Sequence, residues 1–298
     1  MSDENKPMET IAKGAIFIFV GIIFSKFANY LYRVILARYL GPAPYGVFSL
    51  GLAILGVVAI LSLLGVPQGI VRYVSHYKGK DDRTSINGVI FSALKITVPL
   101  ALIFSVFIFI FSDWISVAFF SEPNLGIILR ILAFAIPLTV LVNNLERTLI
   151  AFQAVKFNTI AVNFAGGTAK VVLSFIFVFI GLGLAWVASA FVFSLFIAVV
   201  LLFYFLQKKV YNLKGVLSDK KDMTKTLMKF SFPLLFTDLF AMLLIWMDTL
   251  ILGYFLASEY VGIYNVAVPT AMLVYIVPTT IRTIFYPVIY IGLIILEI

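Results

Sequence analysis

Cysteine is absent from this sequence, histidine occurs once, and charged residues are scarce. Without cysteine, the chain can form neither a disulfide nor a thiolate metal site, and it has no cysteine nucleophile. The single histidine, His76, cannot assemble a metal cluster or a Ser-His-Asp set, and no glycine-rich phosphate loop is present. The sequence therefore predicts a protein that is not an enzyme and that has no metal or other cofactor.

Charged residues make up 12% of the 298 residues, whereas about 25% is usual in soluble domains. Hydrophobic residues reach 62%, aromatic residues 16%, and the mean hydropathy is +1.10. These values are typical of an integral membrane protein, in which lipid accepts much of the apolar surface directly.

Eight apolar segments are long enough to cross a bilayer, which takes about 20 residues per helix. They are continuous and lack the ten-residue alternation of barrel strands, so we predict helices. The segments are 11–38, 45–74, 87–111, 125–152, 159–180, 184–206, 226–255 and 261–285. The predicted fold class is all-α, a polytopic membrane protein with about eight transmembrane helices.

Lysine and arginine are unequally distributed between the loops. The basic loops and helix ends contain Lys6, Lys13, Arg72, Lys78, Lys80, Arg83, Arg147, Lys156, Lys208, Lys209, Lys214, Lys220, Lys221, Lys225 and Lys229. The alternate loops, at 112–124, 181–183 and 257–260, contain no lysine or arginine. The positive-inside rule places the basic loops and the N-terminus in the cytoplasm, so we expect a multi-pass protein of the cytoplasmic membrane. The net charge of +8 then faces anionic lipid headgroups, which argues against nucleic acid as a partner.

The chain contains a weak internal duplication. Segments 30–48 and 245–264 each hold the end of an apolar helix, a short turn and the start of the next helix, with Gly46 matching Gly262. The first helix then corresponds to the seventh. Because an even number of helices per repeat preserves orientation, we predict parallel repeats with a substrate site between them near mid-membrane.

These repeats predict the domain organisation. Residues 1–210 would form a six-helix transmembrane lobe, 211–225 a cytoplasmic linker, and 226–298 the first two helices of a second lobe. A complete second lobe would need about four more helices, so we expect the second lobe to be truncated.

Several cations lie within the apolar helices. A cation at the centre of a membrane helix costs about 2.5–3.5 kcal/mol on insertion scales, so several together indicate a function. Lys26 and Arg33 are seven residues apart and share one helix face with Asn29. The predicted cationic cavity consists of Lys26, Asn29, Arg33, Lys95, Lys170 and Arg282.

Acids deep in the predicted membrane are too few to neutralise these cations. Asp238 and Asp248 differ by about 80° around their helix, so they cannot form a facing carboxylate pair. Each could neutralise a cation, which we favour, or couple transport to an ion. Asp248 is the expected partner of Arg33 because of its position in the repeat.

The surplus positive charge predicts an anionic substrate. A guanidinium forks onto phosphate oxygens and an ammonium adds a point charge, which together suit a phosphate or diphosphate. The alternative interpretation is that the cations snorkel to the surface or form structural ion pairs.

A resemblance to a known family rests on three segments: FSKFANYLYRVILARYLGPAPYGVFSL, LLGVPQGIVRYVSHYKGK and WMDTLILGYFLASEYVGIYNVA. They resemble the polysaccharide and oligosaccharide-lipid flippases of the multidrug/oligosaccharidyl-lipid/polysaccharide exporter superfamily, over residues 11–286. The resemblance implies two six-helix lobes that open alternately to either side of the membrane. It also implies transport of a polyprenyl-phosphate-linked or diphosphate-linked glycan to the outer leaflet, with the cationic cavity receiving the anionic headgroup.

Two other functions remain open. A multidrug or cation exporter of the same superfamily would need carboxylates in its cavity, and the first six predicted helices offer none at mid-membrane. A truncated, non-transporting remnant is the second alternative, because complete members of the family have more helices. The leading expectation is a flippase whose partners are a lipid-linked anionic glycan and membrane lipids. The sugar, the coupling ion and the oligomeric state are not specified by the sequence.

Overall fold

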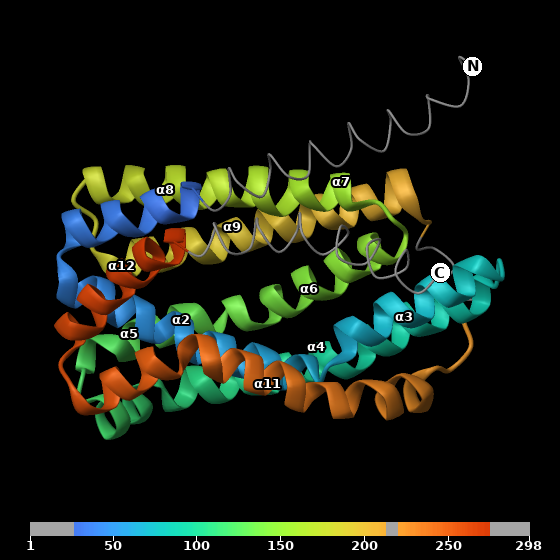
Figure 1. Ribbon diagram of the computed structural model, residues 1–298, viewed down its shortest axis with the longest axis horizontal. Coiled ribbons are helices and arrows are strands. Elements are labelled where there is room, and N and C mark those ends of the chain that lie inside the picture. The colour runs from blue at the N-terminus through green and yellow to red at the C-terminus, as the bar shows by residue number, and fades with distance from the viewer. Residues whose placement is uncertain (1–26, 213–219, 275–298) are drawn as a thin grey trace, which may run out of the picture.

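The computed structural model describes residues 27–212 and 220–274, which fold into a bundle of helices (Figure 1). All regular elements in these two ranges are helical, as predicted. They are a helix over residues 27–40, α2 (Pro42–Leu63), α3 (Val66–Gly79), α4 (Arg83–Phe120), α5 (Pro123–Ala133), α6 (Ala135–Ala151), α7 (Val155–Asn158), the π-helix η1 (Thr159–Gly166), α8 (Gly167–Phe179), α9 (Leu184–Phe205), the π-helix η2 (Leu206–Val210), α11 (Thr224–Phe255) and α12 (Ser258–Val274).

Five of the described helices are long and apolar enough to cross a membrane, or six if the bent pair α5 and α6 counts as one span. The predicted spans at 87–111, 125–152, 159–180, 184–206 and 226–255 coincide with α4, α5–α6, η1–α8, α9 and α11. The first and last predicted spans extend beyond the described residues, which include only part of each.

The second predicted span, 45–74, is interrupted. α2 ends at Leu63, and Leu64 and Gly65 both adopt positive φ angles of 50° and 69° before α3 begins. Pro67 in the first turn of α3 has no N–H to continue the hydrogen bonding of α2. The chain therefore forms two helices here, and the second is a separate basic helix.

Successive helices run back and forth along the long axis of the bundle, so their connections gather at two ends (Figure 1). One end, at the left of Figure 1, is closed by short turns at Gly41, 121–122, 180–183 and 256–257. We call it the turn end. The other end holds the connections rich in lysine and arginine, and we call it the basic end.

The basic end joins segments that are distant in the chain. Lys78 Nζ donates to the Phe152 carbonyl at 3.0 Å, and the Lys221 N–H donates to the Thr84 carbonyl at 3.2 Å. The basic loops are thus gathered at one end of the bundle, and the side of the membrane that they face remains a prediction.

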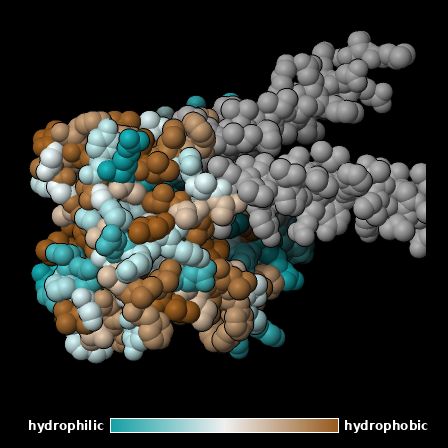
Figure 2. Space-filling view, turned by 60° about the vertical axis from the view of Figure 1, so that its left-hand side comes forward, coloured by the Kyte–Doolittle hydropathy of each residue, from teal (hydrophilic) through white to brown (hydrophobic). Residues whose placement is uncertain are grey.

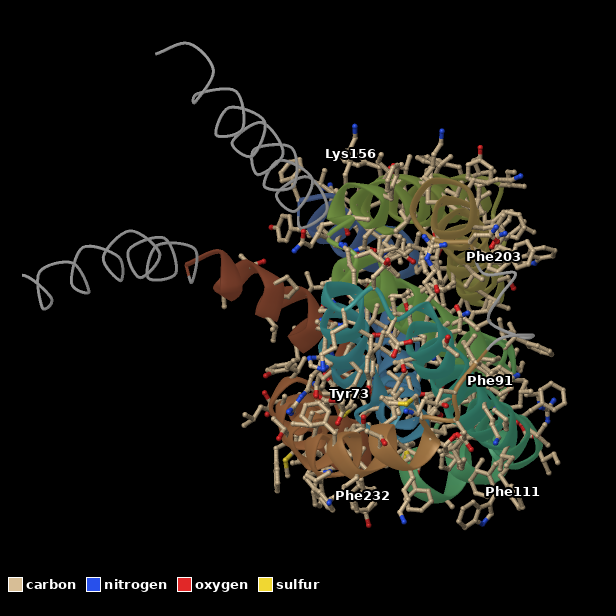
Figure 3. All side chains as sticks on the ribbon, turned by 90° about the vertical axis from the view of Figure 1, so that its right-hand side faces the viewer. Tyr73, Phe91, Phe111, Lys156, Phe203 and Phe232 are labelled. Atoms are coloured by element: carbon tan, nitrogen blue, oxygen red, sulfur yellow. The ribbon has the colours of Figure 1, made fainter. Side chains whose placement is uncertain are left out.

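Large apolar side chains cover the outside of the bundle. Figure 3 shows Phe111, Phe203 and Phe232 at its periphery, where they are 43–52% exposed. Lipid is the solvent that suits such a surface. Figure 2 brings the turn end forward and shows hydrophilic residues among the hydrophobic ones on this face.

α2 is the central helix. In its most apolar stretch 67% of the residues are buried, against 11–28% for the other single spans. Phe48 and Leu50 belong to the same core cluster as Leu125 and Leu129 of α5. The other helices are therefore arranged around α2.

Glycines let α12 lie very close to α2. A Cβ added to Gly46 would lie 1.7 Å from the Ser258 carbonyl oxygen, and one added to Gly262 would lie 1.9 Å from the Pro42 carbonyl oxygen. No side chain fits in either place. Gly46 and Gly262 are the two glycines matched by the internal duplication, and they meet at the turn end.

Candidate functional site

The candidate site is a polar cluster where the helix of residues 27–40 packs against α8. Lys170 Nζ donates to Asn29 Oδ1 at 2.5 Å and lies 4.8 Å from the centroid of the Tyr32 ring. Ser174 Oγ lies 3.3 Å from the Tyr32 hydroxyl and donates to it. Since residues three or four apart share a helix face, Asn29 with Tyr32 and Lys170 with Ser174 form two facing stripes.

Arg33 belongs to the same cluster. Its guanidinium interacts electrostatically with Tyr32, Tyr45 and Lys170. Tyr45 stands in the first turn of α2 and is buried, so the cluster reaches from α8 to the central helix. The structure thus brings together three of the predicted site residues, Asn29, Arg33 and Lys170.

The cluster carries unbalanced positive charge. Within the described part of the chain, no carboxylate lies within ion-pair distance of Arg33 or Lys170. Both side chains are partly buried, and like charges repel more strongly where water is scarce. The Tyr32 ring face and the Asn29 carbonyl oxygen offset part of this cost, since a cation–π contact contributes about 0.5–2 kcal/mol. An anion would balance the remainder.

A π-helix precedes Lys170 in the chain. η1 ends at Gly166, whose added Cβ would lie 3.4 Å from Ala198 Cβ of α9, so the chain is close to its neighbour here. A π-helical stretch changes the angular position of every residue that follows it, and such stretches are frequent at functional sites. The direction in which Lys170 points therefore depends on η1, which the hydrophobic pattern did not predict.

Lys95 lies away from the cluster, contrary to the prediction from depth. It is exposed on α4, and its charge acts on Asp222 at the basic end. The pKa of Asp222 is lowered, chiefly by hydrogen bonds from Thr224 and to a smaller degree by Lys95. α4 has 38 residues and is about 57 Å long, so its first turns extend outside a bilayer core.

The two predicted carboxylates accept hydrogen bonds from neutral donors. Asp238 Oδ1 accepts from Gln68 Nε2 at 2.6 Å, which links α11 to α3. Asp248 Oδ2 accepts from the Tyr264 hydroxyl at 2.6 Å, which links α11 to α12. The expected pairing of Asp248 with Arg33 is therefore not observed, because Asp248 is held by α12. Lys26 and Arg282 lie outside the described residues.

Sequence reasoning missed the polar partners of the cations, because tyrosine and serine are unremarkable in an apolar helix. It also gave no indication that Asn144 is buried and that its Nδ2 donates to Thr97 Oγ1 at 2.7 Å. The one available signal was the position of Tyr32 next to Arg33 on the face shared with Asn29.

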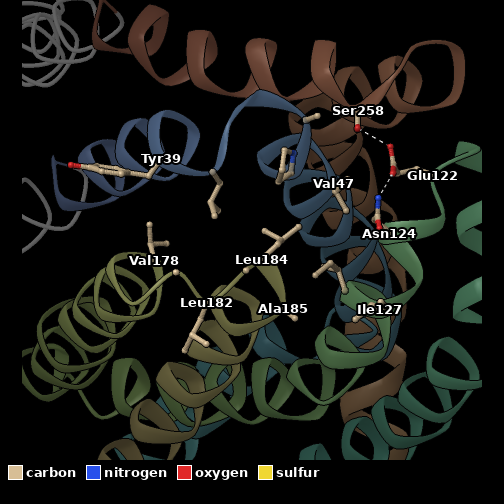
Figure 4. A pocket seen from close by; sticks show the side chains of 16 residues that line it. Tyr39, Val47, Glu122, Asn124, Ile127, Val178, Leu182, Leu184, Ala185 and Ser258 are labelled. Atoms are coloured by element: carbon tan, nitrogen blue, oxygen red, sulfur yellow. Dashed lines mark hydrogen bonds between the residues drawn. The ribbon is translucent and has the colours of Figure 1, made fainter.

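A cavity of about 650 Å³ opens at the turn end (Figure 4). Apolar residues such as Val47, Ile127 and Leu184 form much of its lining. At its rim, Glu122 accepts hydrogen bonds from Ser258 Oγ at 2.8 Å and from Asn124 Nδ2 at 3.2 Å. α12 is thus tied to the start of α5 beside the Gly46–Gly262 contact.

This arrangement is the fold of a class of membrane transporters. The chain is similar to a solved structure described as the inward-facing conformation of a multidrug resistance MATE family transporter of the MOP superfamily, with a TM-score of 0.68 and 17% identity. The match covers 86% of this chain and 61% of the other, so the chain spans about three-fifths of the length of that protein. At this identity the similarity establishes the fold.

The chain belongs to the polysaccharide biosynthesis protein family, whose model matches residues 11–290. No curated protein shows a significant match. The family match confirms the predicted relation to polysaccharide biosynthesis proteins, and the structural similarity confirms the predicted all-helical, MATE-like fold of a multi-pass membrane protein.

Proposed function

We propose that this protein is a flippase that moves a polyprenyl-phosphate-linked or diphosphate-linked oligosaccharide or polysaccharide precursor across the cytoplasmic membrane by alternating access. Membership of the polysaccharide biosynthesis family supports a glycan substrate. The observation that carries the proposal is the pair of cations Arg33 and Lys170, which interact inside the bundle without a carboxylate of the described chain to balance them.

The chemistry of the cluster suits a phosphate headgroup. Arg33 can offer two parallel N–H donors to phosphate oxygens, and Lys170 can offer a point charge once it releases Asn29. The hydroxyl of Tyr32 adds a further polar group beside them. By helical spacing in the sequence, Lys26 shares a face with Arg33 and would extend the site, and Arg282 would add a cation from the second lobe.

The organisation that we propose has a six-helix lobe over residues 1–210, a cytoplasmic linker over 211–225 and the start of a second lobe over 226–298. The basic end and the N-terminus face the cytoplasm in this proposal. Trp114 and Trp186, which are 58% and 50% exposed, then lie near the outer interface, where tryptophan is enriched. The substrate enters from the basic end and leaves at the turn end.

Transport can be tested with the full chain reconstituted in vesicles that contain a fluorescent polyprenyl diphosphate sugar. Dithionite destroys the label in the outer leaflet, so flipping shows as loss of the protected fraction. We expect Arg33→Gln with Lys170→Gln to slow this loss by roughly tenfold or more, the effect of removing charge-assisted hydrogen bonds.

Arg38→Gln is the matched control, because Arg38 is on the same helix but exposed. It should flip the probe at the wild-type rate. Equal rates in the double variant and the wild type would refute the role of the cations. Movement of a cationic dye without movement of the polyprenyl probe would support a multidrug exporter instead.

A further inference from the structure

A groove lies on the outside of the bundle beside the bend between α5 and α6. The two helices meet at 44°, and Phe134 at the bend is 60% exposed. The groove has a volume of about 530 Å³. Its lining includes Phe109, Ile131, Leu138, Phe193 and Phe196, with Arg130 as its charged residue. It is separate from the polar cluster of Arg33 and Lys170.

The bend is built into the backbone. Pro137 has no N–H, so the carbonyl of Ala133, four residues earlier, has no donor within the helix. Ser105 Oγ of α4 donates to this carbonyl at 2.7 Å. A side chain thereby replaces the hydrogen bond that proline removes, as a membrane helix requires. The groove is therefore a fixed feature of the fold.

An ion pair stands at one end of the groove. Arg130 pairs with Asp113 of α4, and its Nε donates to Ser112 Oγ at 3.0 Å. Gly126 allows α5 to approach α4 here, because an added Cβ would lie 2.5 Å from Asp113 Oδ1. The Arg130 and Asp113 side chains are 45% and 64% exposed, so both charges remain accessible from outside the bundle.

The ion pair marks a membrane interface. α4 has no charged residue between Lys95 and Asp113, a distance of about 27 Å at 1.5 Å per residue, which matches a hydrocarbon core of about 30 Å. Trp114 follows directly and is exposed. The groove thus begins at headgroup depth beside Arg130 and continues toward mid-bilayer beside Leu138.

We propose that this groove binds a phospholipid with a primary ammonium headgroup, phosphatidylethanolamine. Its phosphate accepts hydrogen bonds from Arg130, its ammonium donates to Asp113, and one acyl chain lies along the apolar lining. Adjacent positive and negative groups match this zwitterion. Phosphatidylglycerol has no cation for Asp113, and the quaternary ammonium of phosphatidylcholine has no N–H to donate.

Native mass spectrometry of the purified full chain with equal amounts of these three lipids tests the proposal. We expect phosphatidylethanolamine to be retained most strongly. Asp113→Asn should reduce its preference over phosphatidylglycerol by roughly tenfold, the effect of losing a charge-assisted hydrogen bond. Arg130→Gln should weaken retention of all three lipids, because each has a phosphate that Arg130 can contact.

Ser189→Trp provides a variant that leaves the ion pair intact. Ser189 lines the groove and its hydroxyl donates only within α9, to the Ala185 carbonyl, so the indole should fill the acyl-chain path and reduce retention of all three lipids. Arg38→Gln is the control and should bind lipid as the wild type does. Equal retention of the three lipids by the wild type, or wild-type binding by Ser189→Trp, would overturn the proposal.

Discussion

Lys170 shows how a membrane protein keeps a cation inside its bundle. Its Nζ is held by Asn29 Oδ1, a neutral acceptor, rather than by a carboxylate. A neutral amide fixes the position of the ammonium but leaves its charge unbalanced. In the function that we propose, asparagine rather than aspartate at this position favours anion binding over stability.

The first prediction follows from this choice. Asn29→Asp should neutralise Lys170, raise the thermal midpoint and slow flipping of the polyprenyl probe by roughly tenfold, because the added carboxylate competes with the phosphate. Thermal unfolding in detergent and the vesicle assay measure the two effects. Asn29→Leu is the control, since it removes the acceptor without adding charge and should lower the midpoint. Faster flipping by Asn29→Asp would contradict the role of Lys170.

The second prediction concerns Gly262. A methyl group at this position would collide with the Pro42 carbonyl, so Gly262→Ala should destabilise the protein by about 1–3 kcal/mol. Gly183→Ala is the matched control, because an added Cβ there meets nothing within 4 Å and its φ is −66°. Urea or thermal unfolding distinguishes the two variants. Equal unfolding midpoints would show that α12 can shift away from α2 without loss of stability.

At the residue scale, the sequence predicted which side chains carry charge but not where all of them point. The shared face of Asn29 and Arg33 could be predicted, because helical periodicity is fixed within one helix. The contact between Asn29 and Lys170 spans 141 positions and depends on packing and on η1. Lys95 was misplaced because depth was inferred from hydropathy alone.

Among the elements, α4 begins with a side-chain cap that makes its stability depend on pH. Asp82 accepts from the Ser85 N–H at 3.0 Å and from Ser85 Oγ at 2.7 Å. These hydrogen bonds lower the pKa of the Asp82 carboxyl below its ordinary value. A carboxylate with a lowered pKa stabilises the fold above its unfolded pKa, and this stabilisation is lost as pH falls through the folded value.

The third prediction is that the thermal midpoint of Asp82→Asn falls less steeply with decreasing pH than the midpoint of the wild type. Asparagine also caps helices, so the two proteins should have similar thermal midpoints near neutral pH. Below about pH 4 the thermal midpoint of the wild type should fall further than that of Asp82→Asn, because Asp82 becomes protonated. Thermal scans between neutral and acidic pH check this, and parallel curves would contradict it.

Helix boundaries were predicted well where an apolar run met a glycine or charged turn, as at both ends of α9 and α11. They were missed where proline and glycine act inside an apolar run. Leu64 and Gly65 separate α2 from α3, and Pro137 bends α5–α6. Hydropathy averages over such positions, although the sequence LGVP contains the signal for the break.

For the whole molecule, the hydrogen bond from Ser258 Oγ to Glu122 Oε2 joins α12 to the start of α5 at the turn end. In the alternating access that we propose, the turn end opens during transport to release the substrate. If transport requires it to open, a covalent link between α5 and α12 must stop transport.

The fourth prediction uses the absence of cysteine from the chain. Glu122→Cys with Ser258→Cys, joined by a short bifunctional thiol reagent, should block flipping, and a reductant should restore it. Each single variant treated with the same reagent is the control and should remain active. Continued flipping by the crosslinked protein would show that this end does not open during transport.

The contact between Gly46 and Gly262 is reciprocal. Each added Cβ would meet the carbonyl four residues before the other glycine, Ser258 in one case and Pro42 in the other. Such mutual exchange of partners is the mark of an isologous interface between identical subunits. A homodimer of single-repeat chains would bring this glycine against its own copy at the dyad. In the present chain the two glycines are separate positions, so a substitution at Gly46 or at Gly262 alone would break this symmetry.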